Sequence, residues 1–192
     1  MNLPNKLTVL RVILIPFFLL FVLLFKIPHH MVFALIVFAA ASITDWFDGK
    51  IARKHNLVTT FGKFLDPLAD KMLTTAAFLG FIELQIGHGI TWIAFIVLLR
   101  EFLITSLRLI SSGKGKVIAA NMWGKCKTVS QMFAIVFVLA AQYIMSVTET
   151  SAQLETVYSV ATDIVLWVSA VLTVISGLVY VKQNKDFIDP TK

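Results

Sequence analysis

The chain has 192 residues, of which 58% are apolar, and its mean hydropathy is +0.84. A soluble domain of this length would not carry so much apolar sequence, whereas a set of membrane-spanning helices would. The formal net charge of +6 suits a surface that handles anionic lipid headgroups. We expect no nucleic-acid partner, because the basic residues are spread among short connections between apolar segments.

Six apolar segments in chain order predict an all-α, polytopic membrane protein with six transmembrane helices that spans the lipid bilayer. Each segment is close to the ~20 residues that cross the hydrocarbon layer. The connections are short, so residues 1–192 are expected to form one membrane domain. The segments are Leu7–Phe25, Met31–Ala52, Phe64–Leu84, Ile90–Ile110, Met122–Ser146 and Val157–Val181.

The basic residues indicate the orientation in the membrane. With six spans, both termini lie on the same side. If that side is cytoplasmic, only Lys26 of the 17 Lys and Arg residues falls on the outer side. Because basic residues concentrate in cytoplasmic connections, we expect a multi-pass protein of the cell membrane with both termini in the cytoplasm.

Four aspartates stand out in this apolar background: Asp45 and Asp48 near the end of the second segment, and Asp66 and Asp70 near the start of the third. Spacings of three and four place each pair on one helix face. Only about 14 apolar residues, roughly 21 Å of helix, precede Asp45, which is less than the ~30 Å hydrocarbon thickness. A carboxylate at that depth needs a hydrated cavity or a cation.

The connection between these segments should bring the four carboxylates together. We expect Asp66 and Pro67 to open the third helix, because proline suits a first helical turn. In an antiparallel hairpin the two pairs then lie at matched depth and converge on one site that faces the cytoplasm.

Such a site would hold divalent metal ions. Oxygen ligands without supporting Cys or His favour Mg²⁺, Mn²⁺ or Ca²⁺ over zinc or copper. Two divalent ions would balance four aspartates, and paired ions commonly serve phosphoryl-group displacement. Gly49 would let a substrate approach the helix closely, and Arg53, one turn further, could meet a phosphate. The alternative is that the aspartates cap helices and pair with neighbouring Lys and Arg.

The spacing Asp-x₂-Asp-Gly-x₂-Ala-Arg-x₈-Gly-x₃-Asp-x₃-Asp, from Asp45 to Asp70, resembles without a departure the signature of the CDP-alcohol phosphotransferases. The resemblance extends over essentially the whole chain. Within the family, the runs at 2–11, 44–49, 61–71 and 100–108 are most similar to members whose acceptor is glycerol 3-phosphate.

This resemblance implies transfer of a phosphatidyl group from CDP-diacylglycerol to sn-glycerol 3-phosphate, with release of CMP, and a homodimer as the assembly. It implies two Mg²⁺ or Mn²⁺ ions on the four aspartates, with Asp70 also the general base. The implied CDP-diacylglycerol site consists of Asn5, Thr8, Asp45, Gly49, Ala52, Arg53, Gly62 and Asp66.

The acceptor would need fixed positive charge for its phosphate. Arg100 and Arg108 lie about two turns apart on one face of the fourth segment, and Lys125 and Lys127 begin the fifth from the same side. Glu101 should point to a different face from Arg100 and not fully neutralise it. We therefore expect Arg100 and Arg108, with Lys125 and Lys127, to bind glycerol phosphate.

Two other functions are compatible with these sequence features. The signature alone does not separate glycerol 3-phosphate from an inositol phosphate, serine or another alcohol such as choline. A divalent-cation transporter would also use intramembrane carboxylates, although it would need acids near the membrane midplane and an outer access path.

Overall fold

A computed structural model describes residues 2–55, 59–113, 121–148 and 151–185, and of Trp46, residues 48–55, Thr60, Lys63 and Gly113 it describes the backbone alone. The described residues form six helices and no strand, which confirms the predicted all-α fold. The helices are α1 (Leu3–Leu23), α2 (His30–His55), α3 (Thr60–Glu83), α4 (Ile90–Gly113), α5 (Met122–Val147) and α6 (Ala152–Gln183).

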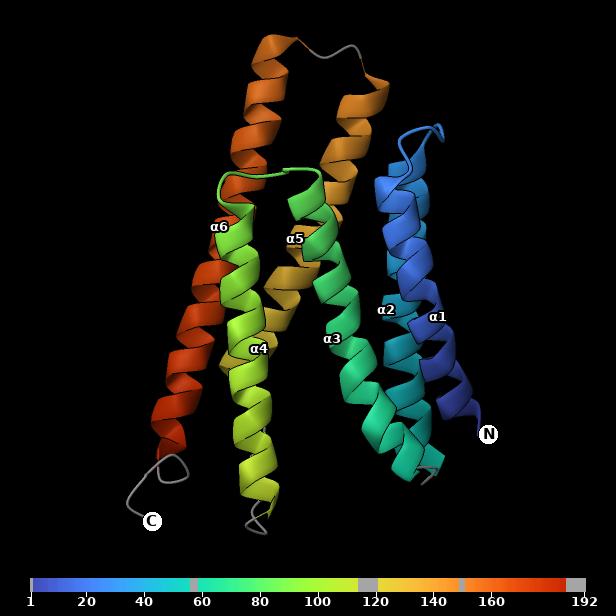
Figure 1. The fold of residues 1–192 in the computed structure, drawn as a ribbon, viewed down its shortest axis with the longest axis vertical. Coiled ribbons are helices and arrows are strands. Elements are labelled where there is room, and N and C mark those ends of the chain that lie inside the picture. The colour runs from blue at the N-terminus through green and yellow to red at the C-terminus, as the bar shows by residue number, and fades with distance from the viewer. Residues whose placement is uncertain (1, 56–58, 114–120, 149–150, 186–192) are drawn as a thin grey trace.

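The helices run alternately up and down, so the start of α1 and the end of α6 lie at the same end of the bundle (Figure 1). We call this the charged end; it holds the starts of α1, α3 and α5 and the ends of α2, α4 and α6. The predicted site residues lie in these helix segments, except Arg100, which lies near the middle of α4. Because consecutive helices alternate in direction, the aspartates of α2 and α3 lie in the same half of the molecule as Arg108 of α4 and the lysines at the start of α5.

Length and hydropathy suit a membrane. Among the described residues, α1, α5 and α6 are long and apolar enough to cross one, and His30–Asp45 of α2 is a shorter apolar helix. Large apolar side chains are exposed on all six helices, for example Ile13, Ile36, Phe95 and Leu178. So much exposed apolar surface is unfavourable in water and favourable against lipid.

One buried core contains residues from all six helices, and within it two groups of helices pack most extensively. In the first, α1 packs against both α2 and α3, with Phe18 and Phe38 in ring contact at 5.6 Å between centroids. In the second, α6 packs against α4 and α5. Among the described residues, α2 and α3 make few direct contacts, so α1 joins the two helices that carry the aspartates.

The start of α3 differs from the prediction. The helix begins at Thr60, and Pro67 therefore lies inside it rather than in its first turn. Thr59 explains the earlier start, because its hydroxyl accepts a hydrogen bond from the Gly62 backbone N–H at 3.0 Å and caps the helix. The expectation that Asp66 and Pro67 open the helix was wrong.

Candidate active site

Asp45 meets a buried arginine of α1. A guanidinium nitrogen of Arg11 lies 2.5 Å from Asp45 Oδ1, and the exposed side-chain fractions are 1% for Arg11 and 49% for Asp45. A buried arginine is costly unless it is paired, so Asp45 provides the negative charge that Arg11 needs. Sequence reasoning missed Arg11; the available signal was a single arginine inside an apolar segment.

Asp66 is held by the same face of α1. The Thr8 hydroxyl donates a hydrogen bond to Asp66 Oδ1 at 2.8 Å. Thr8 and Arg11 are three residues apart and therefore neighbours on one helix face. Through this face α1 contacts both Asp45 of α2 and Asp66 of α3, which the predicted direct hairpin between α2 and α3 did not anticipate.

Asn5 and Gly62 form the next contact between α1 and α3. The Thr59 hydroxyl donates to Asn5 Oδ1 at 3.0 Å, and Asn5 is buried. A Cβ at position 62 would lie 3.0 Å from Asn5 Oδ1 and 3.3 Å from Thr59 Oγ1, so a larger residue would have to displace these side chains by a few tenths of an ångström. Four of the residues predicted for the nucleotide site, Asn5, Thr8, Gly62 and Asp66, are thus brought together.

The remaining residues of the signature lie at the end of α2. The side chains of Asp48, Ala52 and Arg53, and the surroundings of Gly49, lie outside what the structure describes. Among the described side chains, no three His, Cys, Asp or Glu form a group that could hold a metal ion. The three predicted ligands whose side chains are described, Asp45, Asp66 and Asp70, thus do not form such a group. Asp48, the fourth, lies outside this set, and the metal site stays a prediction.

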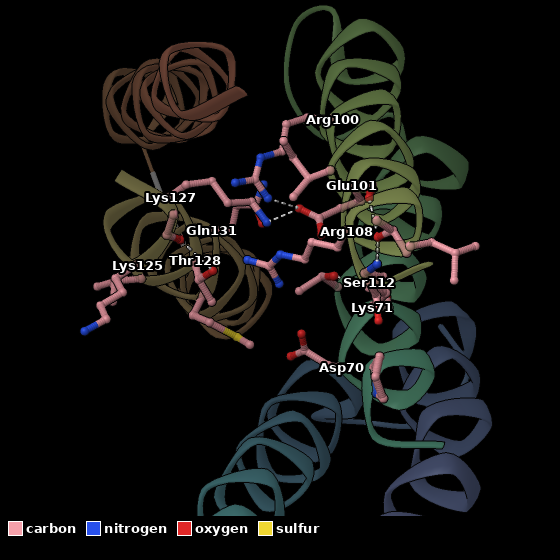
Figure 2. A pocket seen from close by; sticks show the side chains of 18 residues that line it. Asp70, Lys71, Arg100, Glu101, Arg108, Ser112, Lys125, Lys127, Thr128 and Gln131 are labelled. Carbon is pink, nitrogen blue, oxygen red and sulfur yellow. Dashed lines mark hydrogen bonds and ion pairs between the residues drawn. The ribbon is translucent and has the colours of Figure 1, made fainter. Parts of the chain in front are cut away.

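A cavity of about 830 Å³ lies between α3, α4 and α5 at the charged end (Figure 2). Asp70 lines it, one turn along α3 from Asp66. Five cationic and two acidic side chains line this cavity, which gives a formal charge of +3. They are Lys71, Arg100, Arg108, Lys125 and Lys127, with Asp70 and Glu101.

Arg100 is paired more closely than expected. One of its guanidinium nitrogens lies 3.1 Å from Glu101 Oε1, and the other donates to Ser176 Oγ at 2.8 Å. The expectation that Glu101 points away from Arg100 was wrong, because both long side chains can bend toward each other inside the cavity. Lys127 donates to the same Glu101 oxygen.

The other predicted acceptor residues differ in their surroundings. Arg108 Nε donates to the Tyr180 hydroxyl at 3.1 Å, and the guanidinium lies over the Tyr180 ring, 5.6 Å from its centroid. Lys127 is buried, whereas Lys125 is exposed and is directed away from Arg100 and Glu101 (Figure 2). Tyr180 was not predicted, since nothing in its sequence neighbourhood links α6 to α4.

Fold and site together define a class: helical membrane proteins that place carboxylates beside a cationic cavity at one end of the bundle. The chain belongs to the CDP-alcohol phosphatidyltransferase family, whose family model matches residues 1–175.

Curated relatives cover nearly the full length. A Bacillus subtilis protein named CDP-diacylglycerol–glycerol-3-phosphate 3-phosphatidyltransferase is 40% identical over 95% of this chain and 95% of its own. A Haemophilus influenzae protein of the same name is 37% identical over 96% of this chain and 94% of its own. An Escherichia coli protein of that name is 42% identical over 72% of this chain and 76% of its own.

Proposed function

We propose that this chain transfers the phosphatidyl group of CDP-diacylglycerol to sn-glycerol 3-phosphate, giving phosphatidylglycerophosphate and CMP. The observation that carries the proposal is that Asp70 and five cationic side chains line one cavity. A phosphate monoester with a free hydroxyl suits such a cavity, because its phosphate needs cations and its hydroxyl needs a base. Serine and choline carry no phosphate and suit it less well. The names of the relatives support the same acceptor.

We infer that Asp45, Asp48, Asp66 and Asp70 hold two divalent ions, Mg²⁺ or Mn²⁺. Their donor set is all oxygen, which fits these ions. Thr8 and Arg11 on α1 hold Asp66 and Asp45 on the same face, which suits a shared site. When bound, the ions would supply charge stabilisation to the phosphates of the nucleotide.

The residues of this chain have separate roles in the proposed reaction. Asp70 takes the proton from a hydroxyl of glycerol 3-phosphate, and the oxygen of that hydroxyl attacks the lipid-bearing phosphorus of CDP-diacylglycerol. The new P–O bond replaces the bond to the bridging oxygen, which leaves with CMP. Because an aspartate is a weak base in water, its placement against the hydroxyl is essential.

The two substrates would bind on either side of Asp70. The nucleotide would contact the surface between α1, α2 and α3, and the acceptor phosphate would lie in the cavity. The proposed nucleotide contacts are Asn5, Thr8, Asp45, Gly49, Ala52, Arg53, Gly62 and Asp66. The proposed acceptor contacts are Arg100, Arg108, Lys125 and Lys127, of which Lys125 would have to turn inward.

An acceptor panel tests the proposed function. Purified protein in detergent–lipid micelles receives CDP-diacylglycerol, Mg²⁺ and one acceptor at a time: glycerol 3-phosphate, glycerol, inositol phosphate, serine or choline. CMP release should require glycerol 3-phosphate. Glycerol is the matched control, because it offers the same hydroxyl without the phosphate. Release that is equal with glycerol, or faster with another alcohol, would refute the acceptor assignment.

We further propose that the charged end faces the cytoplasm of the cell membrane and that both termini lie there. Residues 1–192 form one domain in this proposal, and two copies form a homodimer. The single cysteine of the chain, Cys126, tests the orientation. It is exposed near the start of α5. A membrane-impermeant maleimide should label it in inverted vesicles and not in intact cells. Cross-linking in native membranes tests the homodimer, which should give a band at twice the mass of the chain.

A further inference from the structure

Glu101 joins two of the cations that line the acceptor cavity. Its Oε1 atom accepts from Lys127 Nζ and from Arg100, the latter at 3.1 Å. The exposed side-chain fractions are 15% for Glu101, 12% for Arg100 and 6% for Lys127. All three charges are therefore largely removed from water, and a single carboxylate oxygen serves both cations (Figure 2).

The surroundings keep this group in place. Ser176 on α6 accepts from the other guanidinium nitrogen of Arg100 at 2.8 Å. The stem of Arg100 is also confined, because a Cβ on Gly177 would lie 3.2 Å from Arg100 Cγ. Arg100 is thus held between Glu101 on its own helix and α6, while Lys127 reaches Glu101 from α5.

Without Glu101 this arrangement would not persist. Two buried cations that share a small volume repel each other. Without Glu101, Lys127 would lose its hydrogen-bond partner, and the other acid that lines the cavity is Asp70. The lysine stem is flexible, so Lys127 would turn away from Arg100, toward water or toward Asp70. The cavity would keep its basic residues, but Lys127 and Arg100 would no longer lie side by side.

We propose that Glu101 is a positioning residue that holds Lys127 and Arg100 side by side for the phosphate of the acceptor. This inference rests on the proposed function. Each cation has further N–H donors beyond the one given to Glu101, and these can bind a phosphate monoester.

The test is Glu101→Gln, which keeps the shape of the side chain and removes its charge. The Michaelis constant for glycerol 3-phosphate should rise roughly 10- to 150-fold, the range expected for loss of one charged hydrogen bond. The constant for CDP-diacylglycerol should change less than about threefold. Glu83→Gln is the matched control, because Glu83 is exposed at the far end of α3 and does not line this cavity; it should leave both constants unchanged.

A double-mutant cycle with Lys127→Met separates positioning from a general structural role. If Glu101 acts through Lys127, the double variant should lose less acceptor affinity than the product of the two single losses. Independent, multiplicative losses would overturn the proposal. So would an acceptor constant that falls in Glu101→Gln, since Glu101 would then compete with the phosphate, or a rise that affects both substrates alike.

Folding is measured by monodisperse elution and thermal stability before any kinetics. If Glu101→Gln does not fold, Glu101→Asp provides the test, because it keeps the charge but shortens the reach to Lys127. An unchanged acceptor constant in a folded Glu101→Asp protein would then overturn the proposal. Failure of the proposed function can be distinguished from failure of the Glu101 proposal, because the unmodified protein would then release no CMP with glycerol 3-phosphate. The same variants would in that case be measured with the phosphorylated acceptor that the protein does use.

Discussion

The contact between Thr8 and Asp66 gives a quantitative prediction. Replacing Thr8 with Val keeps the shape of the side chain and removes the hydroxyl that donates to Asp66 Oδ1 at 2.8 Å. A hydrogen bond to a charged group contributes about 1.5–3 kcal/mol. Asp66 is exposed, so water can replace the lost donor, and the loss should lie near the lower limit. We expect kcat/KM for CDP-diacylglycerol to fall about tenfold, since 1.4 kcal/mol corresponds to a factor of ten.

Initial rates of CMP release measure this effect, with CDP-diacylglycerol varied in mixed micelles at saturating glycerol 3-phosphate and Mg²⁺. Thr8→Ser is the control, because it keeps the hydroxyl and loses one buried methyl group. It should retain most of the activity even where packing makes it less stable. Unchanged kinetics in a folded Thr8→Val protein, or an equal loss in Thr8→Ser, would refute the assignment of Thr8 to the orientation of Asp66.

Three further predictions concern the charged residues. Asp66→Asn should abolish turnover in a folded protein because it removes a proposed metal ligand. EDTA should abolish the activity of the unmodified protein until Mg²⁺ or Mn²⁺ is added, and activity after exhaustive chelation would contradict the metal proposal. Asp70→Asn should lower kcat by orders of magnitude while CDP-diacylglycerol still binds in equilibrium dialysis, and an equally severe loss of binding contradicts its role as base. Arg108→Ala should raise the Michaelis constant for glycerol 3-phosphate roughly 10- to 150-fold with little effect on CDP-diacylglycerol, and Lys125→Ala should have the weaker effect because Lys125 is directed away from the cavity centre.

The sequence predicted the elements of the fold because the signals were local. Runs of about 20 apolar residues set the helices, and spacings of three and four put aspartates on one face. Sequence reasoning also identified Arg100, Arg108 and Lys127, which do line one cavity with Asp70. Helical period and hydropathy were sufficient for the helices and the aspartate faces, since each depends only on residues within one segment. The basic residues were identified from the positive charge that the acceptor phosphate needs.

The partners of these residues could not be predicted in the same way. That Arg11 meets Asp45 depends on how α1 is rotated against α2, and that Tyr180 meets Arg108 depends on the packing of α6 against α4. The bend of Arg100 toward Glu101 depends on side-chain torsions, which helical spacing does not determine. The start of α3 was predicted wrongly for a related reason. Proline favours the first turn of a helix, but the Thr59 cap makes α3 begin earlier than Pro67 indicated.

The arrangement gives α3 a special place in the proposed reaction, because it contributes to both substrate regions. On one side, Asp66 is bound by Thr8 of α1. On the other, Lys71 donates to Thr105 of α4, and Asp70 lines the acceptor cavity between these contacts. A rotation of α3 about its axis would move Asp66 and Asp70 together, since they are one turn apart. The contacts to α1 and α4 oppose such a rotation from both sides. The distance between the nucleotide and acceptor regions therefore depends on the geometry of α3 around Pro67, which lies inside this helix between Asp66 and Asp70.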